Sequence, residues 1–125
     1  MINYAIVGAG WRSEFFLRVA RELPELFNVC CIVEPDTVRA VKKKKKWQVE
    51  AVSGLDKTDK LEQAEFLVLC LPPAVLPEMI ARITNRGHYV LSETYHAESL
   101  DALTRFYSTL DHPELIQVSE QYWLK

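Results

Sequence analysis

Short, strongly apolar runs recur along the chain, and successive runs begin about 17 to 27 residues apart. Turn residues such as Gly8 and Pro35 interrupt them. Runs of this length and spacing predict β-strands separated by other elements. The predicted strands cover residues 2–7, 29–33, 48–52, 65–71, 88–91 and 115–118.

The segments between these runs show the i, i+3, i+4, i+7 spacing of one helix face. One helix is predicted on Phe16, Val19, Ala20 and Leu23, with Pro24 ending it. A second is predicted over 36–46 with Asp36 as its N-cap, and a small polar helix over 56–63. A further helix is predicted on Leu76, Met79, Ile80 and Ile83, with Gly87 after its C-terminus. The last helix is predicted on Leu100, Leu103, Tyr107 and Leu110.

About six strands alternating with helices are typical of an α/β protein with a doubly wound parallel sheet. Strands that are buried on both faces read as unbroken apolar runs, as several of these do. The right-handed crossover rule favours the Rossmann-type strand order 3-2-1-4-5-6. With no repeat or linker in the pattern, residues 1–125 are expected to form a single domain.

Composition narrows the class of protein further. The 125 residues are 49% hydrophobic and 26% charged, with a net charge of −2, so no global basic field attracts nucleic acid. No apolar run is long enough for a membrane span, and nothing resembles a signal peptide. Cys30, Cys31 and Cys70 lack metal-ligand spacing and are expected to be buried, reduced thiols. These features favour a cytoplasmic protein.

The first strand runs into a glycine turn, Gly8-Ala9-Gly10-Trp11-Arg12-Ser13. Gly8 permits a tight turn, and Gly10 lets the backbone approach a pyrophosphate that a Cβ would repel. The helix that follows is expected to offer free N–H groups and a positive dipole end to the anion. Ser13 replaces the third glycine of the usual fingerprint, where helix packing needs a small residue. Arg12 is either a phosphate ligand or simply exposed.

An acidic residue, Glu34, ends the second strand at about the distance expected for a carboxylate that accepts the ribose hydroxyls of a dinucleotide. The alternative is a surface acid beside a helix. A carboxylate there repels a 2′-phosphate, which favours NAD over NADP. Arg39 and the lysines that follow leave NADP open.

Five consecutive lysines, 42–46, precede Trp47. They sweep more than a full helical turn, so some stems are expected to lie along the protein while their ammonium groups reach water. A solvated helix end, stabilised by cations at the negative end of the dipole, is the favoured interpretation over a polyanion contact.

Taken together, these motifs resemble the Gfo/Idh/MocA oxidoreductases, named for glucose-fructose oxidoreductase and inositol dehydrogenase. The likeness covers essentially the whole chain. It rests on four segments in order, namely Ala5 to Gly10, Glu34-Pro35-Asp36, Leu71-Pro72-Pro73, and Gly87-His88-Tyr89-Val90-Leu91-Ser92-Glu93. The segment 118–122 is similar to the strand with which the family leaves its nucleotide domain.

The resemblance implies an NAD(P)-dependent oxidoreductase that moves hydride between nicotinamide and a sugar, polyol or related carbonyl compound. It implies a cofactor-binding set of Gly8, Gly10, Trp11, Arg12, Ser13, Glu34, Leu71, Pro72, Glu93 and Thr94. Leu71 and Pro72 would pack near the ribose, and Glu93 and Thr94 would lie near the nicotinamide. The alternative interpretation gives these residues a structural role: Pro72-Pro73 would only start a helix, and Glu93 would only cap the next one.

Two departures from the family bear on catalysis. Thr94 stands where the family usually places a lysine near the nicotinamide, and threonine cannot act as an acid near neutral pH. The family's substrate domain is expected to be absent, so the chain alone should bind a dinucleotide but turn over little. No residue is assigned as catalytic and none as a metal ligand; His88 and His96 are interpreted as structural, and His112-Pro113 as a turn.

Two other classes stay open. One is a non-catalytic nucleotide-binding module such as a redox sensor or scaffold, which the missing lysine favours. The other is a methyl-transfer domain that binds S-adenosylmethionine, since such domains share a glycine turn and a ribose acid. The Leu71-Pro72-Pro73 segment argues against the latter.

Overall fold

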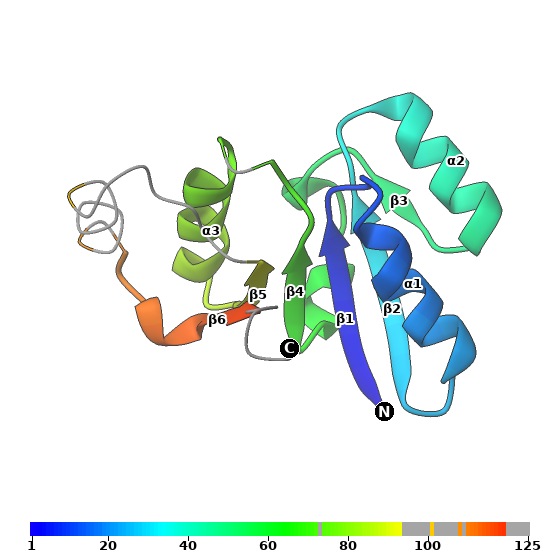
Figure 1. The fold of residues 1–125 in the computed structure, drawn as a ribbon, viewed down its shortest axis with the longest axis horizontal. Coiled ribbons are helices and arrows are strands. Elements are labelled where there is room, and N and C mark those ends of the chain that lie inside the picture. Colours follow the sequence, from blue (N-terminus) through cyan, green and yellow to red (C-terminus); the bar gives the residue numbers. More distant parts are fainter. Residues whose placement is uncertain (73, 94–100, 102–107, 109, 120–125) are drawn as a thin grey trace. The chain divides into compact units, whose positions relative to one another are not determined.

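The structure, a computed structural model, describes residues 1–72, 74–93, 101, 108 and 110–119 (Figure 1). The chain divides into two compact units, Met1–Cys70 and Leu71–Lys125, each of which is described by itself below. The six strands have the order β3-β2-β1-β4-β5-β6, and every strand pair with a resolved register is parallel. Both the α/β class and the predicted strand order are confirmed.

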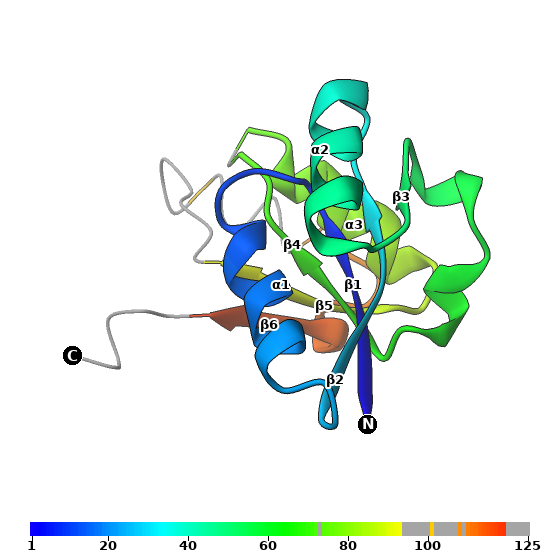
Figure 2. The same ribbon diagram turned by 90° about the vertical axis from the view of Figure 1, so that its right-hand side faces the viewer.

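The first unit holds four strands and two α-helices. In chain order they are β1 (Ile2–Val7), α1 (Ser13–Glu22), β2 (Phe27–Val33), α2 (Thr37–Trp47), β3 (Ala51–Val52) and β4 (Phe66–Leu69). Two short 3-10 helices, η1 (Leu55–Lys57) and η2 (Lys60–Gln63), stand where the small polar helix was predicted. Figure 2 shows α1 on one side of β1 and β2, with the green segment that carries η1 and η2 on the other.

The core of this unit follows from the apolar runs. In β1, β2 and β4, the residues toward the carboxyl end of the strand are buried, as expected for strands covered on both faces. Burial of Tyr4 raises its pKa to about 12, and its hydroxyl donates a hydrogen bond to the Phe16 carbonyl. Its ring also stacks on Phe66. The first strand is thereby tied both to its helix and to β4.

The orientation of α1 differs from the prediction. Ser13 and Leu17 are the buried residues of this helix, whereas Phe16 is half-buried and Leu23 is exposed beyond the helix end. The helix must bury Ser13 against the glycine turn, and the residue one turn later, Leu17, then faces the strands. The predicted face was therefore rotated by about one residue.

Helix α2 begins as predicted, with the Asp36 carboxylate accepting hydrogen bonds from the Val38 and Arg39 N–H groups. It ends at Gln48, which adopts a left-handed conformation with φ 56° and donates to the Lys44 carbonyl. This turn consumes the start of the predicted third strand, so β3 is only Ala51–Val52. Helix α2 contains no buried residue.

The second unit holds α3 (Leu76–Asn85), β5 (Tyr89–Glu93), η3 (Pro113–Leu115) and β6 (Ile116–Ser119). Helix α3 buries Leu76, Ile80 and Ile83 as its spacing predicts. Gly87 follows it with φ 86°, which confirms its role as a C-terminal glycine. The helix predicted on Leu100, Leu103 and Tyr107 lies outside the described residues, although Leu110 is buried.

The three cysteines are free thiols. Cys30 and Cys31 lie buried in β2, and burial raises the pKa of Cys31 to about 11. Cys70 is only half-buried because β4 ends one residue before it, so the expectation of burial was wrong for this thiol. None of the helices in the described part of the chain could span a membrane.

Candidate functional site: the glycine turn and Glu34

The glycine turn joins the carboxyl end of β1 to α1, at the edge of the sheet where β2 also ends (Figure 1). Gly8 has φ 98°, in the left-handed region that glycine adopts without strain. Its N–H donates to the Val33 carbonyl at 2.8 Å, which places the turn beside the end of β2. The Gly8 conformation thus matches its predicted role in a tight turn.

Gly10 presents a different situation. Its φ lies outside the left-handed region, and a Cβ built on it would meet no atom within 4 Å. Neither backbone strain nor contact with the described residues therefore demands glycine here. The missing side chain instead leaves open space in front of the backbone, which is what close approach of a diphosphate requires. This observation fits the dinucleotide predicted from the sequence.

Glu34 lies against the turn rather than on the open surface. Only 6% of the residue is exposed. Its Oε1 accepts a hydrogen bond from the Ala9 N–H at 2.9 Å, and its Oε2 accepts one from the Asp36 N–H at 3.1 Å. A carboxylate has about four acceptor sites, so each oxygen retains capacity for a further donor such as a ribose hydroxyl. The structure thus joins the predicted acid to the predicted turn.

Ser13 is fully buried at the start of α1. Its hydroxyl donates to the Gly10 carbonyl at 2.6 Å, and its N–H donates to the same oxygen at 3.1 Å. The burial agrees with the expectation that this position needs a small residue. The hydrogen bond of its side chain was not foreseen, although a serine three residues after a turn glycine is a known local signal.

The N–H groups at the start of α1 are less free than expected. Those of Ser13, Glu14 and Phe15 donate to the carbonyls three residues earlier, at 3.1 to 3.2 Å. Among the residues that the structure describes, the N–H groups of Gly10 and Trp11 have no hydrogen-bond acceptor. The available donors thus lie in the turn itself, because 3-10-type bonds occupy the first helical N–H groups.

The two side chains between these glycines and the helix lie together. Trp11 is 78% exposed, and the Arg12 guanidinium lies 4.9 Å from the centre of its ring. Both residues therefore lie in the glycine turn, beside the position predicted for the diphosphate. Arg12 also serves as the N-terminal boundary residue of α1 in a helical conformation.

The other predicted site residues belong to the second unit. Leu71 and Pro72 follow β4; Leu71 is half-buried and Pro72 is exposed. Glu93 is the last residue of β5, and Thr94 lies outside the described residues. His88 is half-buried before β5, and His112 precedes η3, with its Nδ1 3.3 Å from Glu114 Oε1. No group of metal-ligating side chains occurs within the described ranges.

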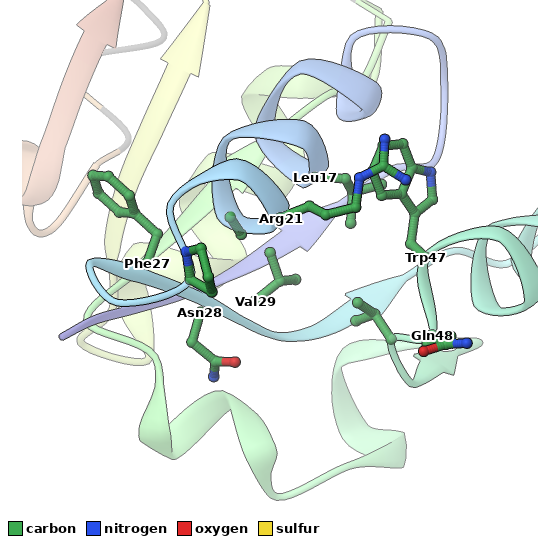
Figure 3. A pocket seen from close by; sticks show the side chains of 10 residues that line it. Leu17, Arg21, Phe27, Asn28, Val29, Trp47 and Gln48 are labelled. Carbon is green, nitrogen blue, oxygen red and sulfur yellow. The ribbon is translucent and has the colours of Figure 1, made fainter.

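A cavity of about 270 Å³ lies elsewhere in the first unit, between the end of α1, the start of β2 and the end of α2 (Figure 3). Figure 3 shows Arg21 reaching over the Trp47 ring, with 4.1 Å between the guanidinium carbon and the ring centre. Phe27 and Asn28 line it from the amino end of β2. The cavity is therefore at the opposite end of β2 from Glu34 and is separate from the glycine turn.

Parallel strands, a glycine turn after the first and a buried acid after the second define a Rossmann-type nucleotide-binding domain. Residues 2–119 match the model of the oxidoreductase family with an NAD-binding Rossmann fold. The chain belongs to this family, the Gfo/Idh/MocA oxidoreductases, which confirms the resemblance. No match was found among curated protein sequences.

Solved structures share the fold at low sequence identity. WlbA dehydrogenase from Bordetella pertussis, in complex with NADH and UDP-GlcNAcA, has a TM-score of 0.79 at 19% identity, covering 99% of this chain and 39% of that chain. Myo-inositol dehydrogenase from Corynebacterium glutamicum has a TM-score of 0.78 at 18% identity, covering 95% and 36%. KijD10, a 3-ketoreductase from Actinomadura kijaniata in complex with NADP and TDP-benzene, has a TM-score of 0.67 at 20% identity, covering 86% and 33%. This chain thus spans well under half the length of these relatives.

Proposed function

We propose that this chain binds NAD at the glycine turn and serves as the cofactor-binding part of an oxidoreductase. The diphosphate would accept hydrogen bonds from the N–H groups of Gly10 and Trp11, with Arg12 adding a positive charge beside it. Glu34 would accept the hydroxyls of the adenosine ribose. The single observation that carries this proposal is the buried Glu34 carboxylate bonded to the turn at Ala9.

The reaction proposed is hydride transfer between nicotinamide and a sugar, polyol or related carbonyl compound. The bound cofactor supplies the hydride chemistry, and the protein supplies binding, orientation and exclusion of water. Leu71, Pro72, Glu93 and Thr94 complete the proposed contact set, toward the ribose and the nicotinamide. Relatives solved with NADH, NAD or NADP support this class of cofactor. A sugar nucleotide in one relative and inositol in the name of another support the substrate class.

Activity and location are also part of the proposal. The relatives are much longer than this chain, so we expect the 125 residues alone to bind cofactor with little turnover. A cytoplasmic location fits the free thiols of Cys30 and Cys31. One sequence feature favours a second function, a non-catalytic NAD sensor, because Thr94 replaces the lysine that the family usually carries.

Calorimetric titration with NAD tests the proposal. We expect saturable binding by the chain and at least about a tenfold loss of affinity in Glu34→Ala. Glu65→Ala is the matched control, because Glu65 also accepts a backbone N–H of a neighbouring strand, from Asn3 at 2.8 Å, but lies at the amino end of β4. Absence of binding by the unsubstituted chain, or equal losses in the two variants, would refute the assignment.

A further inference from the structure

Two buried side chains hold the glycine turn from opposite sides. Glu34, at the end of β2, accepts the Ala9 N–H, and Ser13, in α1, donates its hydroxyl to the Gly10 carbonyl. Glu34 is 6% exposed and Ser13 is fully buried. The bond to Glu34 is therefore buried and the bond from Ser13 is partly buried, so losing either one is costly.

The bond from Ser13 fixes more than one atom. The carbonyl of Gly10 and the N–H of Trp11 belong to the same planar peptide group and point in opposite directions across it. When the Ser13 hydroxyl and N–H together hold the Gly10 carbonyl toward α1, at 2.6 and 3.1 Å, the Trp11 N–H is directed away from the helix. This N–H has no acceptor among the residues that the structure describes.

We propose that Ser13 is a positioning residue for the cofactor: its hydroxyl fixes the Gly10–Trp11 peptide so that the Trp11 N–H is aimed at the diphosphate. This inference rests on the proposed NAD-binding function and adds to it a role for one side chain. A glycine at this position would satisfy the packing but would leave the peptide held only by the backbone. The serine thus contributes preorganisation of the turn in addition to being small.

A hydrogen bond of this kind is worth roughly a factor of 3 to 10 in an equilibrium constant. Ser13 orients an N–H group that would bind the diphosphate. Loss of the Ser13 hydroxyl should therefore weaken the binding only of ligands that contain a diphosphate. We therefore expect Ser13→Ala to weaken NAD about 3- to 10-fold while adenosine binding changes less than about 2-fold. A merely structural serine would weaken both ligands alike.

Two further variants separate the hydrogen bond from volume and from general stability. Ser13→Cys is somewhat larger than serine and has only a weak donor, so it should resemble Ser13→Ala in the titration with NAD if the hydrogen bond, and not the size of the side chain, decides affinity. Thr84→Val removes another fully buried hydroxyl, which donates to the Ile80 carbonyl at 2.8 Å within α3. It should lower stability without changing the ratio of NAD to adenosine affinity.

Amide hydrogen exchange on the ligand-free protein gives a readout that does not depend on cofactor. Exchange at residues 9–12 should accelerate in Ser13→Ala and Ser13→Cys, and not in Thr84→Val. Full NAD affinity in Ser13→Cys, equal losses for NAD and adenosine in Ser13→Ala, or unchanged exchange would overturn the inference. If the unsubstituted chain bound no NAD, the proposed function would fail, and the exchange data alone would still decide whether Ser13 holds the turn.

Discussion

Glu14 and Lys43 form an ion pair that joins the first helix to the second, with 2.7 Å between Oε1 and Nζ. Lys46 Nζ lies 3.1 Å from the same oxygen, and Arg21 of α1 stacks on Trp47 of α2. Because α2 contains no buried residue, these polar and cation–π contacts do much to hold it against α1. The helix they hold follows directly on Glu34 and Asp36.

Replacing Glu14 should therefore weaken the attachment of α2. We expect Glu14→Gln to lower the free energy of unfolding by about 1 kcal/mol, since the pair is only partly shielded from water. The measurement is urea denaturation at neutral pH in low and high salt, and the deficit should shrink in high salt. Glu22→Gln, an exposed acid on the same helix, is the control and should change stability little. Equal effects of the two substitutions would contradict this role of Glu14.

The same pair predicts a dependence on pH. Burial raises the pKa of Glu14, but the hydrogen bonds and charges of Lys43 and Lys46 outweigh it, so the pKa lies below the ordinary value of 4.5. A depressed folded-state pKa contributes stability that is fully present above the unfolded value and is lost as the pH falls through the folded value. The stability difference between the unsubstituted protein and Glu14→Gln should thus be constant above about pH 5.5 and disappear in acid. A difference that persists or grows below pH 3 would show that the ion pair is not its source.

The three glycines at 10, 54 and 87 give a second set of predictions. Gly10→Ala should leave stability unchanged or raise it by up to about 1 kcal/mol, since its φ is not left-handed and its Cβ meets nothing. It should also weaken NAD at least about tenfold, because the Cβ occupies the space proposed for the diphosphate. Thermal unfolding and calorimetry measure the two effects.

Two control glycines complete this test. Gly54→Ala adds a Cβ 3.9 Å from Lys57 Cγ and should alter neither stability nor binding. Gly87→Ala, at φ 86°, should lower stability by about 1 kcal/mol without changing NAD affinity. Unaltered NAD affinity in Gly10→Ala would remove the diphosphate from this turn.

The charge of Glu34 predicts the choice of cofactor. Glu34→Gln keeps an oxygen that can accept the Ala9 N–H but removes the charge that repels a 2′-phosphate. We expect it to lower the affinity for NAD and raise that for NADP, so that their ratio shifts by about tenfold or more. Parallel titrations of both cofactors measure the ratio. A ratio that stays the same would mean that Glu34 does not face the ribose.

Much of this fold could be predicted from the sequence because its strands are buried on both faces. The run 2–7 has no polar interruption except Asn3, and it is strand β1 at both predicted ends. The start of α2 was equally clear, since Asp36 precedes the helix as an N-cap acceptor. The short β3 was not, because only the left-handed turn at Gln48, which no local glycine announces, decides where α2 stops.

The sequence predicted which residues make up the candidate site, but not the hydrogen bonds between them. Spacing placed Glu34 near Gly8 and Gly10, whereas the bond from the Ala9 N–H to Glu34 depends on how β1 and β2 pair. The buried face of α1 was misplaced because apolar spacing alone ignores the constraint that buries Ser13. In the lysine run, Lys43 is mostly covered, whereas Lys42, Lys44, Lys45 and Lys46 are exposed, as the interpretation of a solvated helix end implies.

Titration of the isotope-labelled chain with NAD, followed by backbone amide NMR, tests the central claim most directly. Binding at the turn should produce the largest shift changes at the Gly10, Trp11 and Glu34 amides, with little change at Phe27 and Asn28 beside the separate cavity. The changes should saturate with one molecule of NAD per chain. Saturable changes centred on that cavity, with the glycine-turn amides unmoved, would contradict the account.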